Sequence, residues 1–136
     1  MAKKIWLSMF VCISLLLLLT GCGIGAKEEP REKVDFTVVS EERRPEELAK
    51  LLEQKKTEEF HLTYTDGEAL YICVGYGEQP TGGYSIRVQE CSMAGTNLYV
   101  DTLLVGPESV KDAENTPSYP MIVLKMEQRD VQVNFM

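Results

Sequence analysis

One stretch decides the fold: residues 60–74, FHLTYTDGEALYICV, in which apolar and polar side chains alternate on either side of a turn. Residues 60–65 alternate with a period of two, and residues 70–74 resume the same pattern. Between them, Asp66-Gly67 is the dipeptide most typical of a two-residue β-hairpin turn, because such turns require positive φ. The stretch therefore predicts two antiparallel strands and, with them, a mainly β fold.

The alternation continues beyond this hairpin. It resumes at Ile86, after a Gly-rich loop, and pairing Tyr76 with Tyr84 across that loop would place Val74 opposite Ile86 on one apolar face. We therefore expect a second hairpin in this register. Further strands are predicted at residues 98–105, 121–126 and 131–135, with a turn at residues 94–97 and a long polar connection at residues 106–119.

The segment before the first hairpin has a different period. A short β-branched run at residues 36–39, FTVV, is followed by residues 45–54, PEELAKLLEQ. In this second segment Leu48, Leu51 and Leu52 recur at helical spacing, and acidic residues precede basic ones as a helix dipole favours. The predicted fold class is therefore mainly β (α+β): a small antiparallel sheet or sandwich with one N-terminal amphipathic helix.

The N-terminus predicts a lipoprotein signal peptide. Two lysines precede an apolar run at residues 5–19, which is shorter than the ~20 residues that a membrane-spanning helix needs. The run ends in Leu19-Thr20-Gly21-Cys22, which resembles the bacterial lipobox. That resemblance implies cleavage between Gly21 and Cys22 and attachment of acyl chains, such as palmitate, to Cys22. We expect a protein anchored by lipid in the cell membrane, on its extracytoplasmic face.

The mature chain is expected to consist of a tether and one domain. Residues 22–34 would form the lipidated cysteine and a flexible tether, because they are rich in Gly and charge and almost free of core-forming side chains. Residues 35–136 would form the domain. Removal of the leader, with its two lysines, lowers the formal net charge from −7 to −9. Since nucleic-acid binding requires clustered Lys and Arg, we expect no nucleic-acid partner.

Two of the four cysteines remain in the predicted domain, because Cys12 leaves with the leader and Cys22 is lipidated. In the expected second hairpin, Cys91 lies opposite Ala69, four positions along the strand from Cys73. At about 3.3 Å per residue, this separation exceeds the limit of roughly 7 Å between the Cα atoms of a disulfide. We therefore predict two free thiols.

Candidate catalytic groups are few. His61 is the single histidine and belongs to the outward-facing set of its strand, and neither domain cysteine has a partner at CxxC spacing. No GxSxG elbow or phosphate-cradling loop occurs. Acidic pairs at residues 41–42, 46–47 and 58–59 fall at the ends of elements, where a solvated surface explains them better than glycosidase chemistry. We expect no catalytic residue, no metal site, no small-molecule cofactor and no enzymatic activity.

The segment that stands out is residues 74–86, VGYGEQPTGGYSI. In a purely structural interpretation, its glycines supply positive φ and its proline fixes a turn. In a functional interpretation, it is a stiff loop between two tyrosines that presents backbone groups and aromatic rings to another protein. The partner-binding residues would then be Tyr76, Gly77, Gln79, Pro80, Thr81, Gly82, Gly83 and Tyr84.

This segment resembles the C-terminal domain of the PrcB family, which is marked by a Gly-x-x-x-Thr-Gly-Gly-Tyr turn before an alternating apolar strand. Here the turn is residues 77–84, GEQPTGGY, and the Pro-containing segment that follows later in the family is similar to residues 118–123, SYPMIV. The resemblance extends roughly from Phe60 to the C-terminus. It implies an exported, frequently lipid-anchored protein without known catalytic residues, whose namesake is an accessory subunit of a surface protease complex.

Three functions remain open. The first is an accessory subunit that docks an exported protease through residues 79–84, QPTGGY. The second is a protease inhibitor, because the same residues are similar to the Asn-Pro-Thr-Thr-Gly-aromatic loop of chagasin-type cysteine-protease inhibitors, with departures at two positions. The third is a structural lipoprotein of the cell envelope.

Overall fold

The computed structural model describes residues 25, 29–109 and 115–136. The predicted signal peptide, its cleavage site and Cys22 lie outside these residues. The described part of the chain contains eight strands, one α-helix and one 3-10 turn. In chain order they are β1 (Glu32–Lys33), β2 (Thr37–Val38), the 3-10 turn η2 (Glu41–Arg43), α2 (Glu46–Lys55), β3 (Glu59–Thr65), β4 (Ala69–Tyr76), β5 (Ser85–Ala94), β6 (Asn97–Val105), β7 (Met121–Glu127) and β8 (Gln132–Phe135).

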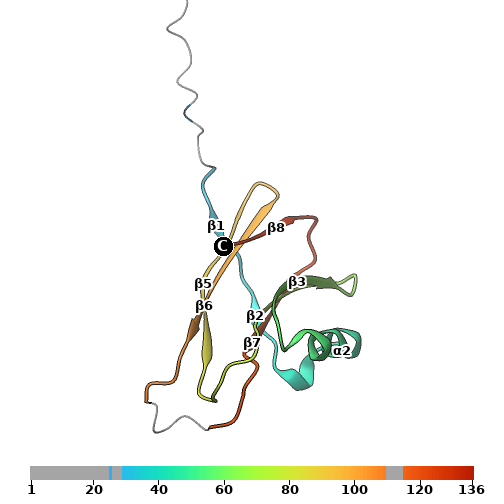
Figure 1. Ribbon diagram of the computed structural model, residues 1–136. Coiled ribbons are helices and arrows are strands. Elements are labelled where there is room, and N and C mark those ends of the chain that lie inside the picture. Colours follow the sequence, from blue (N-terminus) through green and yellow to red (C-terminus); the bar gives the residue numbers. More distant parts are fainter. Residues whose placement is uncertain (1–24, 26–28, 110–114) are drawn as a thin grey trace, which may run out of the picture.

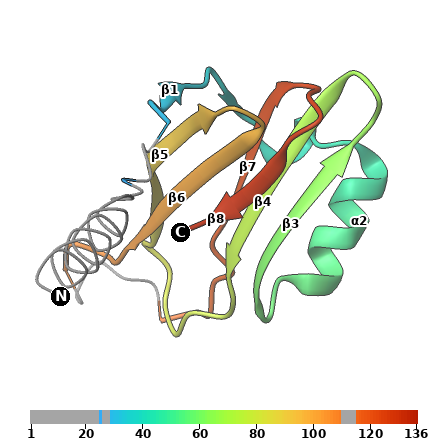
Figure 2. The same cartoon turned by 90° about the horizontal axis from the view of Figure 1, so that it is seen from above.

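The strands form two four-stranded sheets. Sheet A has the order β1-β5-β6-β8, and sheet B has the order β2-β7-β4-β3. Helix α2 packs on the face of sheet B that points away from sheet A, so the molecule has three layers (Figures 1 and 2). The predicted fold class, mainly β with one N-terminal helix, is confirmed. One detail differs: β8 runs parallel to β6, so sheet A is not wholly antiparallel.

The first predicted hairpin is confirmed as β3 and β4. Glu59 pairs with Tyr76 at one end and Thr65 with Leu70 at the other, so residues 66–69 connect the strands in place of the expected two-residue turn. Gly67 has a φ of 93° in this connection. The Asp66 carboxylate accepts hydrogen bonds from the N–H groups of Ala69 (2.9 Å) and Glu68 (3.0 Å). These donors hold the pKa of Asp66 below its ordinary value, Ala69 most strongly. Asp66 is therefore a structural residue of the turn.

The second predicted hairpin, with Tyr76 opposite Tyr84, is wrong. β4 pairs with β3 on one edge and with β7 on the other, so it has no edge left for β5. β5 instead lies in the other sheet and forms a hairpin with β6 through a turn at Gly95. The alternation of apolar residues was read correctly, but the two strands face each other across the core, as layers of a sandwich, and not side by side in one sheet.

The core has two parts, one on each face of sheet B. Between the sheets, Ile72, Val74 and Leu124 of sheet B pack with Leu98 and Val100 of sheet A. Beneath the helix, the other face of sheet B packs against the predicted leucine stripe. The buried members of this second cluster are Val39, Leu48, Leu52, Ala69, Tyr71, Cys73 and Val123.

Cys73 and Cys91 are free and buried, as predicted. The geometric reason differs from the one expected, because it rested on the wrong hairpin. Cys73 belongs to the cluster beneath α2, whereas Cys91 belongs to the cluster between the sheets. The body of sheet B therefore separates the two thiols.

The residues before α2 form a strap, residues 31–39, that crosses from one sheet to the other (Figure 1). β1 pairs with Ser92 and Met93 of sheet A, and β2 then pairs with Leu124 and Lys125 of sheet B. Arg31 forms an ion pair of 2.8 Å with Glu90 and lies 4.0 Å above the ring of Tyr99. The strap thus contacts sheet A from Arg31 onward, and these contacts include residues 31–34 of the expected tether. No helix within the described residues is long and apolar enough to cross a membrane.

The leucine stripe of α2 makes a prediction about stability. Leu48 has 0% of its surface exposed, so Leu48→Ala should lower the free energy of unfolding by roughly 2–5 kcal/mol through lost burial and the remaining cavity. Leu103→Ala is the matched control, because Leu103 is 43% exposed, and it should change stability by less than about 0.5 kcal/mol. Denaturation by urea, followed by circular dichroism, measures both changes. Equal effects would contradict the packing of α2 on sheet B.

Candidate functional site

The Gly-rich segment is a crossover between the sheets. The crossover loop, residues 77–84, leads from β4 in sheet B to β5 in sheet A. The return loop, of which residues 106–109 and 115–120 are described, leads back from β6 to β7 at the same end of the molecule (Figure 1). Gln79 N–H donates to Ser118 C=O at 2.8 Å, and Ser118 N–H donates to Gln79 C=O at 3.0 Å. The two loops are thus joined as a short piece of antiparallel ladder.

Side chains strengthen this junction. The Ser118 hydroxyl donates to the Thr81 carbonyl at 2.6 Å, and the Gln79 Nε2 amide donates to the Tyr76 carbonyl at 3.0 Å. The Thr81 hydroxyl donates to the Gly82 carbonyl at 3.1 Å. Several polar groups that the functional interpretation would present to a partner are therefore satisfied inside the junction.

Two glycines of the crossover loop are required by its backbone. Gly77 has a φ of 71°, and a Cβ atom there would lie 3.2 Å from the backbone of Glu58. Gly83 has a φ of 83°, and a Cβ atom there would lie 2.9 Å from Cβ of Pro107 in the return loop. Side chains other than hydrogen are strained at such φ values, and at Gly83 the space is also taken. The motif glycines thus let the two loops approach each other.

The tyrosines that flank the loop are half-buried and not displayed to solvent. The Tyr76 hydroxyl lies 2.7 Å from the Thr102 hydroxyl and links β4 to β6 across the two sheets. Tyr84 lies against Gly106 of the return loop. Of the eight predicted partner-binding residues, only Pro80 and Gly83 are exposed. The structure brings all eight together, and it gives most of them an internal role.

Sequence reasoning missed two half-buried residues beside the loop, Lys56 and Tyr119, and the exposed Glu78. The Tyr119 hydroxyl donates to the Glu78 carboxylate at 3.2 Å, which is the main reason that the pKa of Tyr119 is raised. The Lys56 ammonium lies 4.9 Å from the centre of the Tyr119 ring. We call Lys56, Glu78, Pro80 and Tyr119 the crossover face. The family resemblance pointed to the segment that contains Tyr119, whereas nothing in the sequence pattern pointed to Lys56.

The cysteines and the histidine have structural surroundings. Burial raises the pKa of the Cys73 thiol to about 12 and also raises that of Cys91, so neither is a thiolate at neutral pH. The His61 ring is stacked on Phe135 with 4.5 Å between ring centres, and it links β3 to β8. Within residues 25, 29–109 and 115–136, no cluster of three or more His, Cys, Asp or Glu residues could hold a metal ion. The acidic pairs at residues 41–42, 46–47 and 58–59 are exposed.

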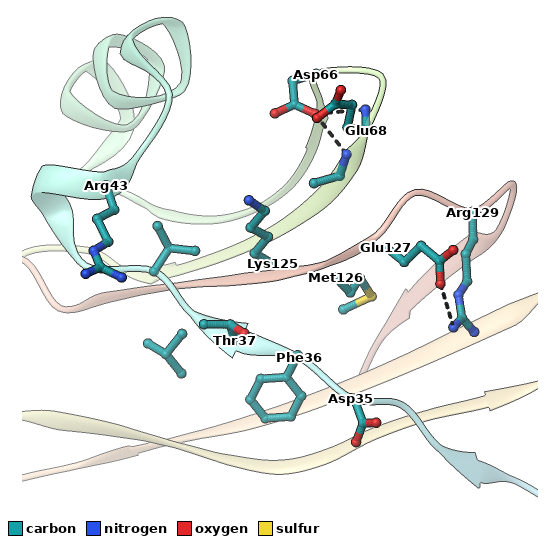
Figure 3. A pocket seen from close by; sticks show the side chains of 13 residues that line it. Asp35, Phe36, Thr37, Arg43, Asp66, Glu68, Lys125, Met126, Glu127 and Arg129 are labelled. Carbon is teal, nitrogen blue, oxygen red and sulfur yellow. Dashed lines mark hydrogen bonds and ion pairs between the residues drawn. The ribbon is translucent and has the colours of Figure 1, made fainter.

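A wide hollow of about 720 Å³ lies between the strap and the end of sheet B (Figure 3). The exposed side chains of Phe36 and Val38 contribute apolar surface to it. Its charged lining residues are of both signs, and Glu127 pairs with Arg129 at 3.7 Å. The Asp66 carboxylate accepts hydrogen bonds from the N–H groups of its own turn. The hollow therefore offers no concentration of charge of one sign that would select a ligand.

The junction of the two loops makes a second prediction. Gly83→Ala should destabilise the protein both by strain at positive φ, about 1–2 kcal/mol, and by the contact with Pro107. Gly67→Ala is the matched control, because Gly67 also has a positive φ but no atom lies within 4 Å of the added Cβ. The Gly83 variant should therefore lose about 1 kcal/mol more than the control in denaturant unfolding. Equal losses would mean that the loops are not in contact at this point.

Comparison with known proteins agrees with this description. Residues 70–127 match the family described as PrcB C-terminal. No curated protein and no solved structure matches the chain. The matched span begins in β4 and ends with β7, so it contains both loops and the junction between them. The resemblance inferred from the Gly-Gly-Tyr turn is confirmed over this span: residues 70–127 match the model of the PrcB C-terminal family.

Proposed function

We propose that this protein is a non-catalytic accessory module, held by lipid at the extracytoplasmic face of the membrane, that binds an exported protease through its crossover face. The observation that carries the proposal is the junction between the crossover loop and the return loop. The family match over residues 70–127 supports the accessory role, since the resemblance implies a subunit of a surface protease complex. The proposed partner is inferred from the family's namesake.

The junction favours binding because it holds exposed groups in fixed positions. Gln79 and Ser118 exchange two main-chain hydrogen bonds, and the Ser118 hydroxyl reaches Thr81. Pro80 lies between these anchored residues and is exposed. A surface that is already ordered loses less conformational entropy on association, so more of its contact energy remains as affinity.

The accessory role fits the loop better than the inhibitor role. A chagasin-like plug needs a loop whose tip enters the cleft of a protease, with its polar groups available to the enzyme. Here the main chain of Gln79 and the carbonyl of Thr81 are bonded to Ser118, and only Pro80 and Gly83 of the predicted contact residues are exposed. This geometry favours a flat docking face over an inserted loop.

The positions of the chain entry and the crossover face support an anchored module. The described chain enters at β1, beside the end of β5 that leads into the turn at Gly95, whereas the crossover loop joins the other end of β5 (Figure 1). β5 has 10 residues, and at about 3.3 Å per residue it spans roughly 30 Å. A lipid on Cys22 would thus leave the crossover face far from the bilayer and open to a partner.

Site-specific crosslinking tests the docking face. A photoreactive amino acid in place of Pro80 should capture an exported protease in intact cells, because Pro80 is exposed at the centre of the junction. The matched control carries the same amino acid in place of Glu47, which is exposed on α2. Mass spectrometry of the adducts identifies the partner. Equal capture from Glu47, or adducts with no protease among them, would contradict the proposal.

Fractionation of cells tests the anchor. Cys22→Ala removes the predicted acyl acceptor, so the protein should leave the detergent-soluble membrane fraction, in which the unaltered protein is expected. Cys12→Ala is the control, because Cys12 lies in the same predicted leader but not in the lipobox. Mass spectrometry should also find acyl chains on the control and none on the Cys22 variant. A Cys22 variant that is processed and distributed like the control would refute lipid anchoring.

A further inference from the structure

One edge of β5 is covered along only part of its length. β1 pairs with Met93 and Ser92, and Val34 N–H then donates to the Cys91 carbonyl at 3.0 Å. At Asp35 the strap leaves sheet A and continues to β7 in sheet B. Within the described residues, nothing pairs with this edge of β5 between Ser85 and Glu90. About half of β5, from Ser85 to Glu90, therefore has an open edge.

The main-chain groups at this edge can be assigned. The Cys91 carbonyl points to the edge, and the Cys91 side chain faces the core between the sheets. Ile86 and Val88 face the same core, across the register shift that lies between Val88 and Glu90. Side-chain direction and main-chain direction alternate together along a strand, so the N–H and C=O groups of Ile86 and Val88 also point outward at the edge.

Two hollows lie along the open edge, one beside each of these residues. A hollow of about 360 Å³ lies between Val88 and the strap, where Phe36 forms part of its wall. A hollow of about 190 Å³ lies beside Ile86, between the beginnings of β5 and β7. It is lined by Tyr84, Ser85, Ile86, Pro120, Met121 and Ile122, of which Ile86, Pro120, Met121 and Ile122 have apolar side chains. The spacing of the two hollows matches alternate residues of a strand.

Arg87 lies between Ile86 and Val88, and its positively charged side chain is on the opposite face of β5 from the two hollows. Arg87 is exposed, and its neighbour across the ladder is Leu103 of β6. Among the described residues, no carboxylate forms an ion pair with Arg87. The chain as a whole is acidic, with a formal net charge of −7. An acidic side chain opposite Arg87 would therefore be attracted to its guanidinium group, although the net negative charge of the protein repels acidic side chains in general.

We propose that the open edge of β5 binds an extended segment of another protein, of apolar–acidic–apolar sequence, as an added antiparallel strand. The apolar side chains occupy the hollows beside Val88 and Ile86, the acidic side chain pairs with Arg87, and the main chain bonds the free N–H and C=O groups. β1 already binds the same edge in this direction, so the added strand continues its course. The inference rests on the proposed function only in that the chain acts by binding another protein.

A second copy of this chain suits the edge less well. Two copies that paired through residues 85–89 in antiparallel fashion would bring their Arg87 side chains together, and like charges in this position are destabilising. The acidic strand avoids that repulsion.

A peptide of sequence Gly-Thr-Leu-Glu-Leu-Thr-Gly is the probe, added to the full chain in detergent micelles. Amide hydrogen exchange at Ile86 and Val88 should slow several-fold when the probe is present. Val133 is the internal control. The Gln132 N–H donates to Thr96, just before β6, and the Met136 N–H donates to Val100 of β6, so the alternation leaves the Val133 N–H at the outer edge of β8. Exchange at Val133 should not change.

A charge swap separates the proposed pairing from unspecific binding. Arg87→Glu should weaken binding of the Glu probe roughly fivefold and strengthen binding of a probe with Lys at the same place, as cross-strand charge pairs do. Arg43→Glu is the matched control, since Arg43 is exposed near the strap but distant in the fold from β5, and it should alter neither affinity. Fluorescence anisotropy of labelled probes measures both.

The proposal fails if exchange at Ile86 and Val88 is unaffected by saturating probe, or if the charge swap leaves the preference between the two probes unchanged. It also fails if exchange at these amides slows with protein concentration alone, because the edge would then join two copies. Probe binding without capture of a protease from Pro80 leaves the edge site standing and removes the proposed partner. Capture of a protease from Pro80 without probe binding removes the edge site and leaves the proposed partner standing.

Discussion

The rest of the structure depends on the complete burial of β4. Its residues from Ala69 to Gly75 are buried, because one face of the strand packs on sheet A, the other lies beneath α2, and both edges carry a partner strand. A strand in this position can accept nothing more. The chain that leaves it must move to the other sheet, and the chain that completes sheet B must come back, so two crossovers at one end of the sandwich follow from the burial of a single strand.

This constraint explains what the family motif does. A Gly-Gly-Tyr turn at the tip of a hairpin would be free to move and to bind. Here the turn passes close to the returning chain, and the residues just before it, Gln79 and Thr81, are hydrogen-bonded to Ser118. The positive φ of Gly83 and its closeness to Pro107 are conditions for that passage. The motif therefore preserves the path of the chain, and the proposed contacts with a partner fall to the crossover face beside it.

The sequence predicted the elements better than their arrangement. The leucine spacing of α2 and the Asp66-Gly67 turn of β3 and β4 are local signals, and both elements formed as expected. The error at Tyr76 arose because two inward-facing apolar strands fit a hairpin and a sandwich equally well. Apolar residues on both faces of 70–74 were the available sign of a central strand. β1 was not predicted because it is a short, exposed edge strand of charged residues without an apolar pattern. The contact between Lys56 and Tyr119 was not predicted because only the tertiary fold brings the two residues together.

The strap has a mechanical consequence. β1 lies antiparallel to β5, and Arg31, just before β1, pairs with Glu90 and lies over the ring of Tyr99. If Cys22 holds the chain in a membrane, tension along the axis of β1 would load these contacts in shear, so that they resist together and do not open one after another. The load then divides between both sheets, because the same nine-residue segment continues into β2 on β7.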